Sequence, residues 1–323
     1  MGNIRQWLVL IAAAFSLGTA VAKENYPSKP ISMVVGFPAG QATDMMSRLV
    51  ADAMAKELGQ TIVVENKPGQ ATSIALNHLK DTPADGYSMM LATPAGVVIN
   101  PHLYKDMRYE TMKDFDFVGT VAEMPFILTT HAESPFNSVA EFLQHAKENP
   151  GRVTFSSPGN GSLAHLGMML LQKQTGVELT HVPYKGSPRA VQDLAAGRID
   201  IGFDTPPLIL PLAKAGKLRP LAATSAERIA ELPELPTMME AGVPDFTMTA
   251  WFIMVVPKGV DKAVIDKLNV TLRKILADEA FVERLANTGA VPRYSTPEDA
   301  AALIREDYAM WGELVKASSA QVD

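Results

Sequence analysis

Ser162 and His165 are the residues whose types and spacing come nearest to an enzyme site. They are three positions apart, so on one face of a helix a serine nucleophile and a histidine base can meet. Two features argue against this chemistry, because the serine lacks a G-x-S-x-G elbow and no obvious acid is placed to orient the histidine. A serine hydrolase therefore stays an alternative, and we assign no catalytic residue.

Metal and sulfur chemistry have little support in the sequence. The 323 residues include no cysteine, which excludes disulfides, thiolate metal sites and cysteine nucleophiles. The six histidines include no pair at the H-x-x-x-H spacing of a helical zinc site. A net charge of −6 without a long Lys/Arg run argues against nucleic-acid binding. We expect no metal, no cofactor and no nucleic acid, but a small molecule or a protein as the partner.

Two loops of small residues are better candidates for binding. They are Phe37-Pro38-Ala39-Gly40-Gln41-Ala42-Thr43-Asp44 and Ser157-Pro158-Gly159-Asn160-Gly161-Ser162-Leu163-Ala164-His165. Each follows a predicted strand and opens a helix, where glycine admits a ligand close to backbone N–H groups and the helix N-terminus carries partial positive charge. Each can therefore hold a carboxylate or phosphate, although neither matches a nucleotide-binding motif. The alternative is that both are ordinary turns, with Thr43 or Ser162 as helix caps.

Further polar residues end predicted strands at the same level. Tyr184 can pack on the carbon skeleton of a ligand, and Lys185 can supply charge or simply be solvated. Asp204 can accept a hydrogen bond from a ligand or cap the next helix. Thr93 and Ser156, the last residues of two predicted strands, complete the candidate set.

The elements that must position these residues alternate between strand and helix. The predicted elements are strand 31–37, helix 42–58, strand 61–65, helix 72–79 and strand 87–93, then strand 152–156, helix 161–174, strand 178–183, helix 187–196 and strand 199–204. This alternation predicts an α/β protein with mostly parallel sheets flanked by helices. Because the series occurs twice, we expect two lobes.

The extended segments 115–121, 125–128 and 246–256 read as crossings between the two lobes. The segment 261–315 is predicted to be helical, and Thr296-Pro297-Glu298-Asp299 is a typical helix start. We therefore expect a discontinuous first lobe (23–123 plus 250–323), a second lobe (124–249) and a hinged cleft between them, where ligands of open α/β sheets bind.

The first 22 residues have the pattern of a cleavable signal peptide. Arg5 precedes an uncharged run from Trp7 to Ala22, which ends in Ala20-Val21-Ala22. An uncleaved anchor is the alternative, but these 16 residues fall short of the roughly 20 that span a bilayer. We expect a periplasmic protein without a lipid anchor, since that anchor needs a cysteine.

Short motifs along nearly the whole mature chain resemble the Bug family, the periplasmic solute-binding proteins of tripartite tricarboxylate transporters. The motifs are Tyr26-Pro27-Ser28-Lys29-Pro30-Ile31, Phe37-Pro38-Ala39-Gly40 to Asp44, Val64-Glu65-Asn66-Lys67-Pro68-Gly69, Pro83-Ala84-Asp85-Gly86-Tyr87, Asn100-Pro101-His102-Leu103-Tyr104, Gly159-Asn160-Gly161-Ser162 with His165, Val182-Pro183-Tyr184-Lys185-Gly186, Gly216-Lys217-Leu218-Arg219-Pro220-Leu221-Ala222 and Glu234-Leu235-Pro236-Thr237.

The resemblance implies a Venus-flytrap fold, a two-lobed periplasmic binding protein that closes over a small mono- or dicarboxylate. It implies delivery of this solute to membrane permease subunits. We expect a monomer, and a ligand sensor for a membrane receptor is an alternative. Family contacts fall on Phe37, Ala39, Gly40, Thr43 and Asp44 in one lobe, on Gly159, Asn160, Gly161, Ser162 and His165 in the other, and secondarily on Tyr184, Lys185 and Asp204.

The chain departs from the family pattern in its loops. Gln41 stands where the family usually has a second glycine, and Gln70-Ala71 follow Pro68-Gly69 where more glycines are usual. A glutamine adds a donor and an acceptor and restricts the backbone φ angle. We therefore add Gln41 to the candidate contacts, and the identity of the solute does not transfer from the family.

Overall fold

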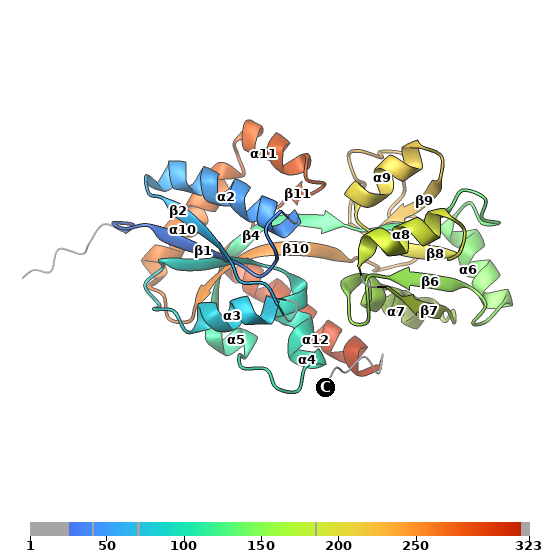
Figure 1. Ribbon diagram of the computed structural model, residues 1–323, viewed down its shortest axis with the longest axis horizontal. Coiled ribbons are helices and arrows are strands. Elements are labelled where there is room, and N and C mark those ends of the chain that lie inside the picture. The colour runs from blue at the N-terminus through green and yellow to red at the C-terminus, as the bar shows by residue number, and fades with distance from the viewer. Residues whose placement is uncertain (1–25, 41, 70–71, 185, 318–323) are drawn as a thin grey trace, which may run out of the picture.

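The computed structural model describes residues 26–40, 42–69, 72–184 and 186–317. The predicted signal peptide, residues 1–22, lies outside this range. Two α/β lobes lie side by side along the long axis of the molecule, and each is built around its own β-sheet (Figure 1). The two-lobed α/β fold expected from the sequence is confirmed. The lobe boundaries, 23–123 with 250–323 for the first lobe and 124–249 for the second, stay a prediction.

The first lobe contains a six-stranded sheet in the order β11-β4-β10-β3-β1-β2. Its strands are β1 (Ile31–Val35), β2 (Ile62–Asn66), β3 (Ser88–Ala92), β4 (Phe115–Pro125), β10 (Thr249–Pro257) and β11 (Val291–Pro292). β1 pairs in parallel with β2 and β3. The other pairs are antiparallel: β10 with β3 and β4, and β11 with β4.

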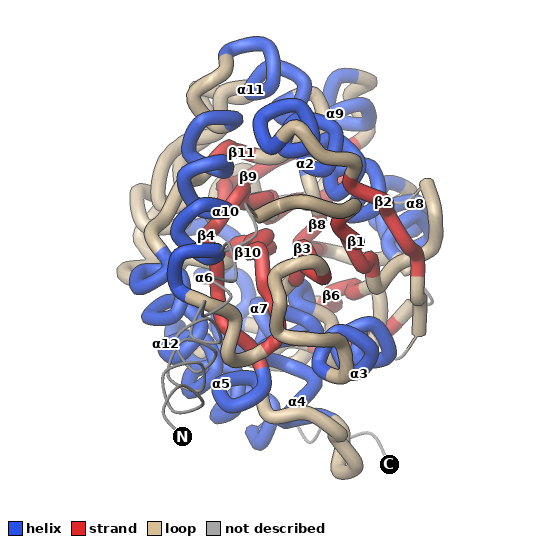
Figure 2. The backbone as a smooth tube through the Cα atoms, turned by 90° about the vertical axis from the view of Figure 1, so that its left-hand side faces the viewer, coloured by secondary structure: helices blue, strands red, loops and turns tan. Residues whose placement is uncertain are grey.

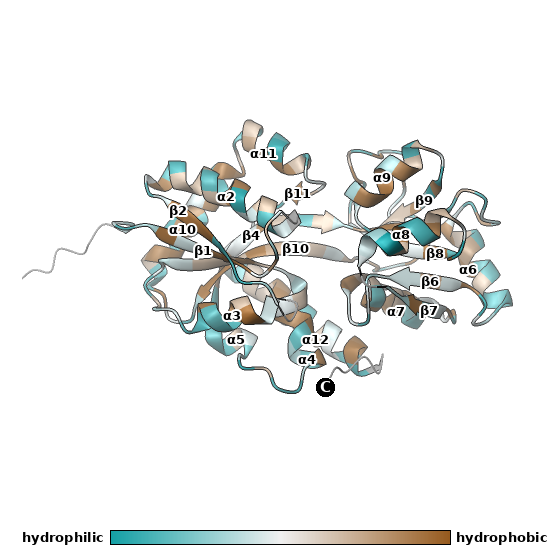
Figure 3. Cartoon of the chain, in the orientation of Figure 1, coloured by the Kyte–Doolittle hydropathy of each residue, from teal (hydrophilic) through white to brown (hydrophobic). Residues whose placement is uncertain are grey.

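Helices cover both faces of this sheet (Figure 2). One face carries α2 (Ala42–Leu58), α10 (Lys262–Ile275) and α11 (Glu279–Ala286), and the other carries α3 (Ser73–Lys80), the π-helix η2 (Ala95–Ile99), α4 (Asn100–Leu103), α5 (Thr111–Asp114) and α12 (Pro297–Ala317). Met46 and Val50 of α2 and Leu268 and Leu272 of α10 are fully buried in one core cluster with Met33 of β1. Apolar residues are prominent in the central strands, whereas polar residues mark the outer helix faces (Figure 3).

The second lobe contains a five-stranded sheet in the order β7-β6-β8-β5-β9. Its strands are β5 (Ile127–His131), β6 (Thr154–Ser157), β7 (Thr180–Pro183), β8 (Ile201–Asp204) and β9 (Leu218–Ala223), and its helices are α6 (Val139–Glu148), α7 (Leu163–Thr175), α8 (Ser187–Ala195) and α9 (Pro206–Lys214). β6 pairs in parallel with β7 and β8, whereas β5 pairs antiparallel with β8 and β9.

Both sheets are thus mixed, which local sequence patterns did not predict. The parallel strands β1, β3, β6 and β8 form the expected βα units. β5 follows β4 after a single residue and therefore runs away from the first lobe, whereas β6 and β8 run toward it. β10 likewise returns from the second lobe and runs against β3. The chain crossings therefore impose the antiparallel pairs.

Thr224 joins the segments that cross between the lobes. The Phe126 N–H donates to Thr224 Oγ1 at 2.8 Å, and the Thr224 N–H donates to the Phe126 carbonyl at 2.9 Å. Thr224 Oγ1 donates to the Met248 carbonyl at 2.6 Å, and the Met248 N–H donates to the Thr224 carbonyl at 2.9 Å. One buried residue therefore holds both connections together at the point where they leave the second lobe.

Candidate functional site

The carboxyl ends of the parallel strands in both lobes point toward the opposite lobe (Figure 1). Two glycines show where the lobes approach each other near these ends. A Cβ atom built on Gly161 of the second lobe would lie 2.7 Å from the Leu103 side chain of the first lobe. A Cβ atom built on Gly289 of the first lobe would lie 2.8 Å from the ring of Pro207 in the second. The loops at the strand ends are thus brought close to the other lobe.

Asp44 organises the loop that follows β1. Its carboxylate accepts the Gly40 N–H at 2.8 Å, the Asn66 side-chain amide at 2.8 Å and the Arg48 guanidinium at 3.0 Å. Asn66 also donates to the Phe37 carbonyl at 3.0 Å. Hydrogen bonding to Arg48 lowers the pKa of Asp44 to about 2, and the bonds from Gly40 and Asn66 act in the same direction against the effect of burial. Asp44 is therefore ionised and paired at neutral pH.

The other predicted residues of this loop differ in their exposure to solvent. Ala39 and Gly40 are exposed, Phe37 is half-buried, and Gly40 has a φ of 84° that favours glycine. Thr43 is buried, and its carbonyl accepts the Ser47 hydroxyl at 2.7 Å. Gln41 lies outside the described residues. Sequence reasoning missed Arg48 and Asn66 as partners of Asp44, although the i,i+4 spacing of Asp44 and Arg48 was a usable signal.

His165 and Ser162 organise the loop that follows β6. The Gly161 N–H donates to His165 Nδ1 at 3.1 Å. Ser162 Oγ donates to the Gly159 carbonyl at 2.7 Å and accepts the His165 N–H at 3.3 Å, which makes it the N-cap of α7. Gly161 has a φ of 73°, and Asn160 is exposed beside it. The capping role considered for Ser162 is thus observed.

An imidazole stack supports this second loop. The rings of His165 and His181 lie 4.1 Å apart and nearly parallel, and His181 stacks in turn on Phe155 at 4.7 Å. Burial lowers the pKa of His165, and burial together with the neighbouring His165 lowers the pKa of His181 to about 4. Both imidazoles are therefore neutral at pH 7. Sequence reasoning missed His181, which reaches the site because β7 pairs with β6.

Neither serine–histidine pair has the properties expected of a hydrolase site. His165 Nδ1 is occupied by the Gly161 N–H, and the Ser162 hydroxyl is committed to the Gly159 carbonyl. A second pair, Ser157 Oγ and His181 Nε2, lies at 2.7 Å, but Ser157 is only 1% exposed. An imidazole whose pKa is about 4 is also a weak base at neutral pH.

Thr93 and Ser156 are buried at the strand ends, as their positions predict. The hydroxyl of Thr93, whose residue is 7% exposed, has no hydrogen-bond partner among the described residues. Ser156 packs against Gly202 of the neighbouring strand β8, where a Cβ atom would lie 2.8 Å from Ser156 Oγ. Thr93 thus presents at this level a buried hydroxyl that is unpaired within the described part of the chain.

Asp204 and Tyr184 make local contacts. Asp204 is 5% exposed and accepts the Thr205 N–H at 2.8 Å at the start of α9, while burial raises its pKa. The Tyr184 hydroxyl donates to Asp193 of α8 at 2.9 Å, so its polar end is engaged within the second lobe. Lys185 lies outside the described residues.

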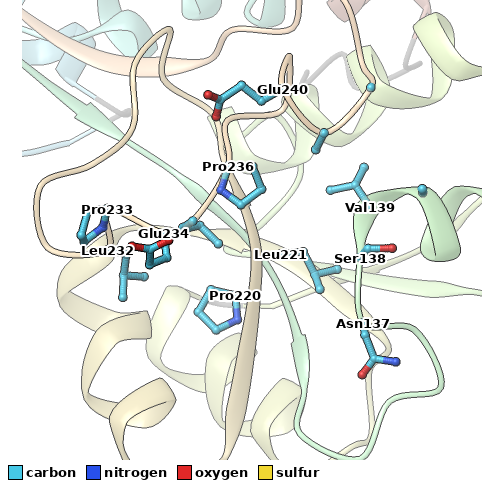
Figure 4. A pocket seen from close by; sticks show the side chains of 14 residues that line it. Asn137, Ser138, Val139, Pro220, Leu221, Leu232, Pro233, Glu234, Pro236 and Glu240 are labelled. Atoms are coloured by element: carbon cyan, nitrogen blue, oxygen red, sulfur yellow. The ribbon is translucent and has the colours of Figure 1, made fainter.

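A separate hollow lies on the second lobe, away from the strand ends. It has a volume of about 760 Å³ and is lined by residues of α6, β9 and the segment 232–242 (Figure 4). It includes none of the predicted site residues. Across the described ranges, no three His, Asp or Glu side chains are grouped to hold a metal ion. No helix within those ranges is long and apolar enough to span a membrane.

Comparison with known proteins places this architecture in one family. Residues 46–319 match the model of the tripartite tricarboxylate transporter family receptor. The chain is 33% identical to the BugT protein of Bordetella pertussis over 315 residues, which cover 97% of this chain and 96% of BugT.

Solved structures give the same result. The Rpa4515 protein of R. palustris, solved with adipate, is 34% identical, with a TM-score of 0.76 over 91% of this chain and 99% of that one. MatC from Rhodopseudomonas palustris, solved with bound malate, is 28% identical, with a TM-score of 0.72 over 90% and 100%. The chain therefore belongs to the Bug-type tripartite tricarboxylate transporter receptors and is a solute-binding protein of that family.

Proposed function

We propose that this receptor captures a small mono- or dicarboxylate between its lobes in the periplasm and delivers it to the membrane permease subunits, without a chemical step of its own. The observation that carries the proposal is the pair of glycine-containing loops, one in each lobe, that open α2 and α7. Helix N-termini favour anions. The adipate and malate complexes of the relatives support a carboxylate ligand.

The loop geometry gives the predicted contacts different roles in this proposal. Because the N–H groups of Gly40 and Gly161 donate to Asp44 and His165, those two side chains position the loops. The ligand then meets the surrounding residues. The proposed contacts are Phe37, Ala39, Gly40, Gln41, Thr43 and Thr93 in the first lobe, and Ser156, Gly159, Asn160, Gly161, Ser162, Tyr184, Lys185 and Asp204 in the second.

Electrostatics near the loops suit an anion despite the net charge of −6. Asp44 is paired with Arg48, so its charge is compensated locally. The neutral imidazoles of His165 and His181 leave the partial positive charge of the α7 N-terminus unopposed by a carboxylate. Local backbone dipoles, rather than the overall field of the protein, would then attract the ligand.

Closure of the lobes would report binding to the membrane partner. A ligand that contacts both loops binds the closed state more tightly and shifts the population toward it. The contacts of Leu103 with Gly161 and of Pro207 with Gly289 are compatible with such a closed state. We propose that the receptor acts as a monomer, released from its signal peptide into the periplasm without a lipid anchor.

A thermal-shift panel tests the proposal. Mono- and dicarboxylates including malate, succinate and adipate are compared with sugars and cations of equal concentration. A ligand at 100 times its Kd stabilises the native state by about 2.7 kcal/mol, so a clear rise in Tm is expected with at least one carboxylate. A response to sugars or cations alone would contradict the proposal. Mass spectrometry of the solution after incubation should recover the carboxylate unchanged, whereas a product would indicate catalysis.

A further inference from the structure

The hollow on the second lobe has apolar walls. Leucine and proline side chains dominate its lining, which includes Leu221 of β9 and the segment after β9 (Figure 4). The leucines and prolines of the lining are Pro220, Leu221, Leu232, Pro233, Leu235 and Pro236. Apolar walls of this kind suit the insertion of an apolar side chain.

The walls of the hollow are held in place by hydrogen bonds. Arg219 donates to the carbonyls of Ser134 and Phe136 at 3.2 Å each, which fixes the loop before α6. Arg228 donates to Glu240 at 2.9 Å and to the Pro233 carbonyl at 3.0 Å, which fixes the far wall. A hollow that is already formed reduces the entropic cost of binding.

The adjacent sheet edge favours side-chain insertion over strand addition. β9 is the outermost strand of its sheet, and the segment after it bonds to the strand only near Ala223, whose N–H donates to the Pro236 carbonyl at 2.8 Å. Pro220 lies beside the hollow on the same strand and has no N–H to offer a new strand. The occupant is therefore held mainly by its side chains.

The charged residues around the hollow indicate which kind of partner can bind there. The charged residues that line it, Glu234 and Glu240, are both acidic. The segment 225–245, which supplies eight of the fourteen lining residues and with them this part of the rim, contains five acidic residues and one basic residue, Arg228, which is paired with Glu240. This rim repels a carboxylate and attracts lysine or arginine. The hollow is thus unsuited to the proposed solute and suited to a basic protein segment.

We propose that the hollow is the docking site of the membrane partner, which inserts an apolar side chain flanked by lysine or arginine. The inference rests on the proposed function, because a receptor that delivers its solute must contact the permease. The acidic rim steers the basic segment, and the apolar walls supply the affinity. The solute loops and the docking hollow are separate sets of residues, so they can be tested separately.

Uptake by proteoliposomes that contain the permease subunits tests the proposal. Radiolabelled malate and adipate are the probes, and each receptor variant is added outside. Leu232→Asp places a charge in the apolar wall, and we expect uptake to fall at least about tenfold. Glu234→Lys should lower uptake about fivefold at low salt and weaken its salt dependence. Lys56→Glu, on α2 of the first lobe, is the matched surface control and should leave uptake unchanged.

Calorimetry on the same variants separates docking from solute binding. We expect Leu232→Asp and Glu234→Lys to keep the wild-type Kd for the probe within about twofold, and the conservative Leu232→Met to keep both affinity and uptake. Wild-type uptake by the docking variants would overturn the docking proposal, as would a loss of solute affinity. A wild-type dimer that Leu232→Asp dissociates would assign the hollow to a second copy and also overturn it. If the wild-type protein binds no carboxylate, the proposed function itself fails.

Discussion

The two glycine loops contain the same type of hydrogen bond but differ in the side chain that accepts it. In each, the N–H of a glycine with positive φ donates to the side chain four residues later: Gly40 to Asp44 in the first lobe, Gly161 to His165 in the second. The first acceptor is an ionised carboxylate paired with Arg48, whereas the second is a neutral imidazole in an aromatic stack. The first loop therefore depends on charge, and the second on packing and the protonation state of histidine.

Asp44→Ala should have the largest effect, because it removes the acceptor for three donors at once. Gly40, Asn66 and Arg48 each lose a part-buried hydrogen bond to this carboxylate. We expect the free energy of unfolding to fall by about 2–3 kcal/mol, measured by urea denaturation. Asp44→Asn keeps an acceptor for Gly40 but loses the charge, so its loss should be smaller. A change below about 0.5 kcal/mol in Asp44→Ala would show that the network does not hold the loop.

The next largest effect is the difference in stability between Gly161→Ala and Gly40→Ala. Both glycines have positive φ, so each substitution should cost about 1 kcal/mol of backbone strain. At Gly161 the new Cβ also meets Leu103 of the opposite lobe at 2.7 Å, whereas at Gly40 nothing lies within 4 Å. We expect Gly161→Ala to be the more destabilising by about 1 kcal/mol.

A double-mutant cycle isolates that difference. Leu103→Ala combined with Gly161→Ala should show a coupling energy of about 1 kcal/mol, because removing the leucine relieves the contact. The same leucine variant combined with Gly40→Ala serves as the control and should show no coupling. Equal coupling in both cycles would mean that the contact between the lobes is not what distinguishes the two loops.

The positions of both loops were predictable from sequence, but their internal partners were only partly so. Hydrophobic periodicity identifies the strands and helices locally, and glycines mark the turns between them. The partner Asn66 lies 22 residues from Asp44, and His181 reaches His165 only through the pairing of β6 with β7. Such contacts depend on which strands become neighbours, and a local pattern does not contain that information.

Strand direction was unpredictable for the same reason. The segments 115–121 and 125–128 were predicted to be extended, and they lie in β4 and β5. Their antiparallel pairing follows from the route of the chain between the lobes. The docking hollow was likewise absent from the sequence expectations, because α6 lies far from β9 and the segment 232–242 in the chain and meets them only in the folded lobe.

The pH dependence of stability should separate the loops by the titratable side chains that support them, His181 beneath the second loop and Asp44 in the first. The pKa of His181 is about 4 in the folded protein and about 6.5 when unfolded, so the unfolded state binds more protons between these values. The stabilisation is complete above pH 6.5 and is lost as the pH falls toward 4. The pKa of Asp44 is lowered from 3.8 to about 2, so its contribution is lost only as the pH falls from about 4 to 2.

Urea denaturation between pH 7 and 3.5 measures this difference. Because His181 is partly exposed, we expect a loss of about 1–2 kcal/mol attributable to it across the upper range. His181→Gln should flatten the profile between pH 6.5 and 4, whereas Asp44→Asn should leave the slope in that range unchanged. A flattened slope in Asp44→Asn, or an unchanged slope in His181→Gln, would contradict the prediction that His181 rather than Asp44 causes the loss of stability between pH 6.5 and 4.

The smallest expected effect concerns Ser162, which caps α7 in the second loop. Ser162→Ala removes the acceptor for the His165 N–H and the donor to the Gly159 carbonyl, so we expect a loss of about 1 kcal/mol. Ser162→Asp retains a capping acceptor and should recover most of that stability. A nucleophile would behave differently, because ester hydrolysis by the wild-type protein would disappear in both variants. Recovery of stability by aspartate without any ester turnover would identify the residue as a cap, whose hydrogen bond supports the second loop together with the aromatic stack.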